Sequence, residues 1–110
     1  MTEVKLQISV SKEGKLILNP ERISLLRSIE ESRSLLTASK QIGISYNKAW
    51  RILDAMNTAT DKTIVEKLRG GKGGGGALLT DYGRFILKEY VAIEDTVNEF
   101  AKKLNTEINL

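Results

Sequence analysis

The stretch that decides the fold is Ser34-Leu35-Leu36-Thr37-Ala38-Ser39-Lys40-Gln41-Ile42-Gly43-Ile44-Ser45-Tyr46-Asn47-Lys48-Ala49-Trp50-Arg51-Ile52-Leu53. Ser34 can cap a short helix, because a serine side chain accepts a hydrogen bond from the free amides of a first helical turn. Gly43 supplies the left-handed backbone that a tight turn between two helices needs. Ser45 can then cap a second helix. This order is typical of a helix-turn-helix, which we place at residues 34–57.

The residues before this motif predict a small hairpin and a helix. Leu6–Val10 alternates apolar and polar residues, as a half-buried strand does, and Leu16–Leu18 can return as a second strand after a turn at Lys12–Lys15. Asn19 and Pro20 then favour a helix start, which predicts a helix over residues 19–32. Its buried stripe is formed by Ile23, Leu25, Leu26 and Ile29.

The residues after the motif predict a wing, meaning two strands joined by a flexible tip. Asp61–Leu68 contains the apolar residues of a short strand, and Ala77–Leu79 can return as its partner. Between them, Arg69–Gly76 holds six glycines in eight positions. It formally contains the G-x-G-x-x-G pattern of dinucleotide sites, but no strand-helix-strand unit surrounds it, and Lys72 is not followed by the Ser or Thr of a P-loop. A wing over residues 62–79 explains it better, with a plain flexible loop as the alternative.

A final helix over residues 80–104 opens at Thr80, a favourable cap followed by acidic Asp81. Six apolar residues recur along it at intervals of four and three, the spacing of a helix-helix seam: Ile86, Tyr90, Ile93, Val97, Phe100 and Leu104. A stripe packed inside one protomer would show the same spacing. Because the helix is too long for a domain of this size to cover, we favour a homodimer contact along this seam.

The composition limits the kinds of chemical site that the chain can contain. The chain has 110 residues, enough for one domain, and it has no Cys and no His. Disulfides, Cys-based or His-based metal sites and the commonest acid-base residue are therefore absent, and no pair of carboxylates stands out in an apolar setting. We expect no enzyme, no metal and no cofactor. The chain has neither a signal peptide nor an apolar run long enough to span a bilayer, so we expect a cytoplasmic protein without membrane contact.

The positive charge gathers in the middle of the chain. The net charge is only +3, yet residues 33–72 contain eight Lys or Arg against three acids, whereas residues 81–110 contain four against six. Such asymmetry is what attraction to nucleic-acid phosphates requires, although an incidentally basic solvated face would give the same count.

The second helix of the motif carries the candidate contacts to double-stranded DNA. Ala49, Leu53 and Met56 have the spacing of a buried face, which leaves other residues to enter a major groove about 12 Å wide. We predict base and phosphate contacts from Ser45, Tyr46, Asn47, Lys48 and Arg51, and wing contacts from Arg69 and Lys72. Asn47 suits adenine, while Lys48 and Arg51 suit guanine or phosphate. For Trp50 we expect packing against a neighbouring element rather than contact with DNA.

These residues also resemble a known family. The motif quoted above, then Leu53-Asp54-Ala55-Met56-Asn57, then Gly70 to Thr80 with its glycine run, is similar to the N-terminal domain of ModE-type molybdate-responsive regulators, which are LysR-like winged helices. The resemblance covers roughly residues 14 to 104. It implies a homodimer that places its recognition helices in successive major grooves of an inverted repeat, with the long C-terminal helix contributing to the dimer.

The sequence departs from the family in one respect. It ends at Leu110, where longer members continue into a domain that binds the oxyanion, so molybdate binding is not expected. We therefore predict a mainly α winged helix-turn-helix with an N-terminal hairpin, a β wing and a long C-terminal dimerisation helix. The predicted function is sequence-specific transcription regulation. A non-specific architectural DNA-binding protein and a winged-helix protein-interaction module remain as alternatives.

Overall fold

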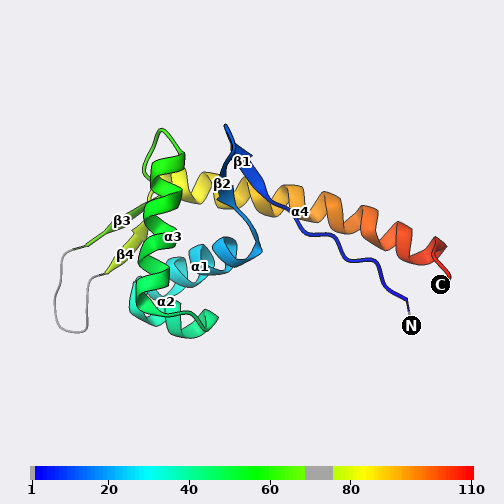
Figure 1. The fold of residues 1–110 in the computed structure, drawn as a ribbon, viewed down its shortest axis with the longest axis horizontal. Coiled ribbons are helices and arrows are strands. Elements are labelled where there is room, and N and C mark those ends of the chain that lie inside the picture. Colours follow the sequence, from blue (N-terminus) through cyan, green and yellow to red (C-terminus); the bar gives the residue numbers. More distant parts are fainter. Residues whose placement is uncertain (1, 69–75) are drawn as a thin grey trace.

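A computed structural model of the chain describes residues 2–68 and 76–110. Within these ranges the chain forms four helices and two small antiparallel sheets (Figure 1). In chain order the elements are β1 Val10–Lys12, β2 Lys15–Leu18, α1 Pro20–Ser32, α2 Leu35–Ile42, α3 Tyr46–Ala59, β3 Val65–Lys67, β4 Ala77–Leu79 and α4 Asp81–Glu107. This architecture confirms the predicted winged helix-turn-helix.

The helix-turn-helix forms as its capping residues predict. The Ser34 hydroxyl accepts a hydrogen bond from the Thr37 amide at 3.1 Å and opens α2. Gly43 ends α2 with a φ of 77°, in the left-handed region where glycine carries no steric penalty. Ser45 then caps α3 by accepting from the Lys48 amide at 3.0 Å. Local side-chain chemistry therefore sets both helix starts and the turn between them.

The N-terminal hairpin is shorter than predicted. β1 pairs with β2 only from Val10 to Lys12, and the expected strand residues Leu6–Ser9 lie outside it, paired with no strand of the described ranges. The reason is that β2 ends at Leu18, because Asn19 caps α1 and Pro20 begins it. No strand is thus left opposite the residues that precede Val10.

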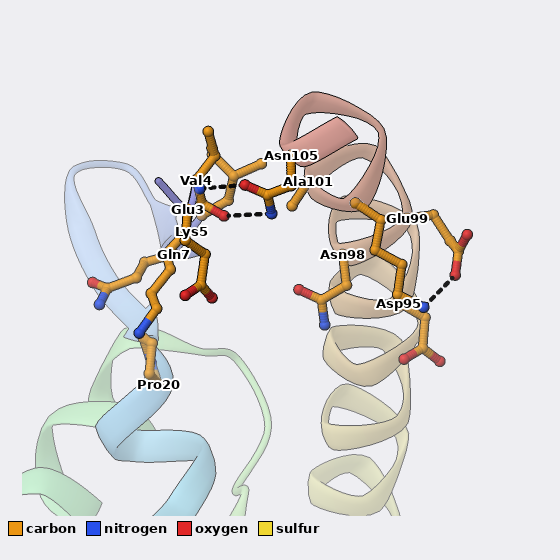
Figure 2. A pocket seen from close by; sticks show the side chains of 12 residues that line it. Glu3, Val4, Lys5, Gln7, Pro20, Asp95, Asn98, Glu99, Ala101 and Asn105 are labelled. Atoms are coloured by element: carbon orange, nitrogen blue, oxygen red, sulfur yellow. Dashed lines mark hydrogen bonds and ion pairs between the residues drawn. The ribbon is translucent and has the colours of Figure 1, made fainter. Parts of the chain in front are cut away.

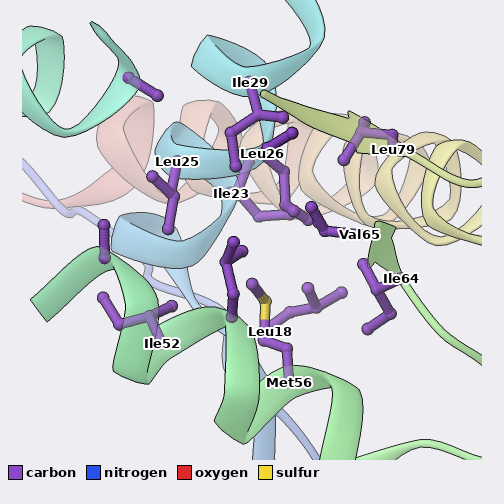
Figure 3. Packing of buried hydrophobic residues seen from close by; sticks show 14 of the residues in the cluster. Leu18, Ile23, Leu25, Leu26, Ile29, Ile52, Met56, Ile64, Val65 and Leu79 are labelled. Atoms are coloured by element: carbon purple, nitrogen blue, oxygen red, sulfur yellow. The ribbon is translucent and has the colours of Figure 1, made fainter. Parts of the chain in front are cut away.

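One apolar core joins α1, α3 and the wing strands (Figure 3). The predicted stripe of α1 is confirmed, since its four apolar residues are at most 2% exposed. Ala49, Leu53 and Met56 of α3 belong to the same cluster and are fully buried. Ile64 and Val65 close the core next to β3, so the wing is anchored to the same core as the helix-turn-helix.

The long helix α4 begins on this core and then leaves it. Thr80 caps the helix by accepting from the Gly83 amide, while its amide donates to the Ile64 carbonyl at 3.0 Å and its hydroxyl to the Thr63 carbonyl at 2.6 Å. The helix ends at Glu107, three residues beyond the prediction, and its C-terminal half extends away from α1–α3 beside the N-terminal residues (Figure 1). None of the helices in the described ranges has both the length and the apolar character that a bilayer span requires.

Candidate nucleic-acid interface

Helix α3 has one buried and one open face. Ala49, Leu53 and Met56 have no exposed surface, whereas Asn47, Lys48 and Arg51 are exposed. The buried residues follow each other at intervals of four and three, which is one face of a helix. The three polar side chains therefore lie on the side that the core leaves accessible, and α3 can serve as a recognition helix.

The two cations of this face differ in their surroundings. The Lys48 ammonium lies 3.2 Å from a carboxylate oxygen of Glu21 at the start of α1. Both side chains are about half exposed, so this pair can open at little cost when a phosphate competes for the lysine. Arg51 makes no ion pair with any residue in ranges 2–68 and 76–110, which leaves its guanidinium available for an acceptor outside the protomer.

The N-terminus of α3 is anchored by its aromatic residues. Tyr46 is partly buried and meets the ring of Trp50 edge to face, with centroids 6.4 Å apart. Both residues pack against the apolar core, which agrees with the packing role predicted for Trp50. The Ser45 hydroxyl oxygen accepts the capping bond from the Lys48 amide, which leaves its O–H group able to donate. At this end, Ser45 and Tyr46 hold the helix in place, and Ser45 and Asn47 are both exposed.

A contact that the sequence analysis missed joins α3 to the wing. The ammonium of Lys67 on β3 lies 3.5 Å from the centroid of the Trp50 ring and also pairs with the carboxylate of Asp54. Trp50 and Asp54 are one helical turn apart on α3, so the lysine bridges two adjacent turns. The position of Lys67 in a short predicted strand held no sign of this role, because the contact depends on how the strand docks.

A second missed residue is Asn57, close to the end of α3. Its side-chain oxygen accepts from the amides of Ile64 and Val65 at 2.8 and 3.3 Å, and its side-chain amide donates to the Val65 carbonyl at 3.0 Å. One side chain thereby satisfies three backbone groups where β3 begins. The motif Met56-Asn57 thus has a structural explanation, because methionine enters the core while asparagine holds the wing strand.

The base of the wing is tied to the helix-turn-helix as well. β3 and β4 pair from Val65 with Leu79 to Lys67 with Ala77. The Ala77 amide donates to the Arg33 carbonyl between α1 and α2 at 3.2 Å, and Gly76 forms a bridge with Ser34. The wing therefore starts from a fixed position relative to α2 and α3. The predicted wing contacts Arg69 and Lys72 lie outside the described residues.

The predicted seam of α4 divides into core and surface residues. Tyr90 is buried in its own protomer, where its hydroxyl donates to the Ile8 carbonyl at 3.0 Å. Ile93 and Phe100 are 44% and 57% exposed, while Ile86, Val97 and Leu104 are partly buried. Phe85, which lies outside the predicted seam, is 56% exposed. The helix thus presents large apolar side chains to solvent along much of its length.

Comparison with known proteins finds bacterial regulators with a similar sequence. Over 88 residues, which make up 80% of the chain, the sequence is 40% identical to the DNA-binding transcriptional dual regulator ModE of Escherichia coli K12. The chain is a homologue of ModE regulators. It is also 35% identical over 103 residues to the molybdenum transport protein ModE of Azotobacter vinelandii. The predicted resemblance to ModE-type regulators is confirmed, although no family model matches the sequence.

The chain spans about a third of the length of these ModE relatives, covering 34% of the first protein and 38% of the second. Among solved structures, that of the CbnR_DBD–DNA complex matches with a TM-score of 0.62 over 78% of this chain and 93% of the other. Sequence identity to that protein is 16%, so the match bears on the fold alone. The two chains share this fold.

Proposed function

We propose that the chain is a sequence-specific DNA-binding transcription regulator that acts as a homodimer on an inverted repeat. The observation that carries this proposal is the open face of α3, where Asn47, Lys48 and Arg51 are exposed on a helix whose other face is fully buried. Such a helix fits a major groove, where an asparagine can pair with adenine and an arginine with guanine or phosphate. The ModE relatives of Escherichia coli, which are named transcriptional regulators, support this proposal.

The second part of the proposal concerns the homodimer. A DNA site with two-fold symmetry is recognised by two recognition helices at a fixed spacing. Holding the helices at that spacing requires a stable contact between protomers. The solvent-exposed apolar residues of α4, with Ile93 and Phe100 foremost, support a contact along the predicted seam. Tyr90 is buried within its own protomer, so its part would be to hold α4 in position for that contact. No catalytic activity is assigned, because the chain has no His or Cys and relatives such as ModE of Escherichia coli K12 are named transcriptional regulators.

The test is a selection of genomic fragments by the purified protein, followed by fluorescence anisotropy on the most enriched fragment across a range of salt concentrations. We expect an inverted repeat whose half-site centres lie about one helical turn apart, bound at least about 10³-fold more tightly than random DNA. The double variant Lys48→Ala/Arg51→Ala should lose this affinity. Lys88→Ala/Lys103→Ala, which removes two exposed lysines of α4, is the matched control.

The two alternatives give different results in the same experiment. An architectural protein would bind with a steep salt dependence but would enrich no sequence, because phosphate contacts carry no base information. A protein-interaction module would not bind DNA even at low salt, and the Lys48→Ala/Arg51→Ala variant would then behave like the native chain. Either result would contradict the proposed function.

A further inference from the structure

The residues before β1 form an extended arm, which we define as residues 2–9. The arm runs beside the C-terminal half of α4 and pairs with no strand in the described part of the chain (Figures 1 and 2). Its sequence nevertheless alternates as a strand does, with apolar Val4, Leu6 and Ile8 separated by polar residues. Leu6 remains 40% exposed over a cleft of about 880 Å³ between the arm and α4. The pattern of a strand is thus present without its pairing.

The contacts of the arm show which of its edges is occupied. Asn105 of α4 binds both the amide and the carbonyl of Val4 through its side chain, and the Tyr90 hydroxyl donates to the carbonyl of Ile8 (Figure 2 shows the Asn105 pair). In an extended chain the backbone groups of successive residues point to opposite edges. The even-numbered residues therefore direct their backbone groups toward α4.

The opposite edge is open. The backbone groups of Lys5 and Gln7 point away from α4 by the same alternation, and they make no hydrogen bond with any residue that the structure describes. A row of free amides and carbonyls on an extended segment is a template for pairing with another strand. β1 continues this segment, so the open edge belongs to a strand that is already held in place at both ends.

The sequence selects a second copy of the same arm as the partner. When two arms run antiparallel with Leu6 opposite Leu6, Lys5 faces Gln7 and Val4 faces Ile8, so apolar residues share one face and polar residues the other. A register shift of two residues, which moves the centre of the pairing from Leu6 to Lys5, would place Lys5 opposite Lys5, and like charges directly opposite are unfavourable. In the Leu6-centred register the odd-numbered residues form the hydrogen-bonded pairs, and theirs are the open backbone groups.

We propose that the arms of two protomers pair as antiparallel β-strands about Leu6, and that this pairing builds the dimer interface. The inference rests on the homodimer of the proposed function and names the element that builds it. Because the paired edges point away from α4, arm pairing is an alternative to a contact along the α4 seam. It would also shield the two Leu6 side chains from solvent, because each covers the other.

Cysteine cross-linking tests the pairing and its register, since the native chain contains no cysteine. In Leu6→Cys, the two thiols would occupy a non-hydrogen-bonded pair with Cα atoms about 4.5 Å apart, within the range of a disulfide. In the matched control Lys5→Cys, each thiol would lie on the opposite face of the paired strands from Leu6. Each would also lie opposite Gln7 of the other arm, two positions from the second thiol. We expect Leu6→Cys to form an intermolecular disulfide under mild oxidation at least about tenfold faster than Lys5→Cys.

Each other outcome overturns the inference in a recognisable way. Equal rates, or faster cross-linking of Lys5→Cys, would contradict the Leu6-centred register. Slow cross-linking of Leu6→Cys in a protein that sedimentation shows to be dimeric would remove arm pairing but leave the homodimer intact. A protein that sediments as a monomer at every concentration would overturn the homodimer and the arm pairing together.

A proline variant tests the backbone hydrogen bonds independently. Gln7→Pro removes an outer-edge amide from both arms, whereas Gln7→Ala changes the same side chain and keeps the amide. We expect Gln7→Pro to raise the dimer dissociation constant about tenfold or more relative to Gln7→Ala. Equal dissociation constants would show that this edge is not paired. Circular dichroism of both variants verifies that the fold is retained.

Discussion

The ammonium of Lys67 lies 3.5 Å from the centroid of the Trp50 ring, and this contact joins the wing strand β3 to the recognition helix α3. Lys67 also pairs with Asp54, and its side chain is 23% exposed, so the cation is partly shielded from water. A shielded cation over an indole face is attracted by the ring quadrupole more strongly than a fully hydrated one. The orientation of the wing and that of α3 are thereby linked through one side chain.

Lys67→Met keeps the apolar stem and removes the charge. We expect it to lower the free energy of unfolding by about 1 kcal/mol, because the cation–π contact is lost and Asp54 loses its partner. Trp50 is the one tryptophan of the chain, so its fluorescence follows both the local contact and urea unfolding. Lys67→Arg retains a cation and should be less affected. Equal stability of Lys67→Met and the native chain would contradict the argument.

Asn57→Ala should destabilise the wing. The change leaves the amides of Ile64 and Val65 and the carbonyl of Val65 without their side-chain partner, and we expect the free energy of unfolding to fall by about 2 kcal/mol in urea titrations. Asn57→Asp keeps the acceptor oxygen and should lose less. Asn47→Ala, at an exposed position of the same helix, is the control and should change stability by a few tenths of a kcal/mol.

Local capping explains why so much of the fold could be predicted. Ser34, Gly43 and Ser45 act on residues within a few positions of themselves, and the structure confirms the elements that they delimit. The strand predicted at Leu6–Ser9 fails for the opposite reason, because pairing needs a partner that β2 cannot supply once Pro20 has begun α1. A period-2 pattern thus indicates that a segment can form a strand but does not name its partner.

The same distinction between local and non-local interactions applies to the candidate site. The open face of α3 follows from helical spacing, since burying Ala49, Leu53 and Met56 leaves Asn47 and Arg51 outside. The roles of Lys67 and Asn57 depend on how β3 docks against α3, and no local pattern expresses that docking. The burial of Tyr90 within its own protomer depends in turn on the path of residues 2–9 along α4.

Gly83→Ala should be destabilising even though alanine favours helices. A Cβ atom at this position would lie 2.2 Å from the carbonyl oxygen of Ile64, which is backbone and cannot rotate away. The gain in helix propensity of about 1 kcal/mol is therefore exceeded by the displacement of α4 from the wing, and we expect a net loss of about 1–3 kcal/mol. Lys88→Ala in the same helix is the control for propensity. A higher melting temperature of Gly83→Ala would contradict the close packing.

The pH dependence of stability should carry a contribution from Tyr90. Burial raises the pKa of its hydroxyl above the usual value of 10.0, with the nearby Glu94 adding to the rise. Above about pH 10 the unfolded chain therefore loses this proton more readily than the folded chain, and stability falls as the pH rises. Below that pH the contribution is fully present.

Tyr90→Phe removes this titration together with the hydrogen bond to Ile8. The difference in the free energy of unfolding between the native chain and Tyr90→Phe should be constant up to about pH 9 and should decrease above pH 10. Taking this difference cancels the other groups that titrate at high pH, Lys12 among them. A difference that stays constant to pH 11 would mean that the Tyr90 hydroxyl keeps its ordinary pKa.

Asn47→Ala tests whether α3 reads bases. Asn47 is exposed beside the N-terminus of the helix, and its amide offers a donor and an acceptor to the edge of an adenine. We expect the variant to bind the selected site more weakly by about 1–3 kcal/mol and random DNA almost as well as before, as anisotropy titrations at one salt concentration would show. Lys48→Ala is the matched comparison, because loss of a phosphate contact should weaken binding to both DNAs alike and lower the salt dependence. Equal losses on the two DNAs for Asn47→Ala would show that this side chain contacts the backbone instead, and base reading would then rest on Arg51.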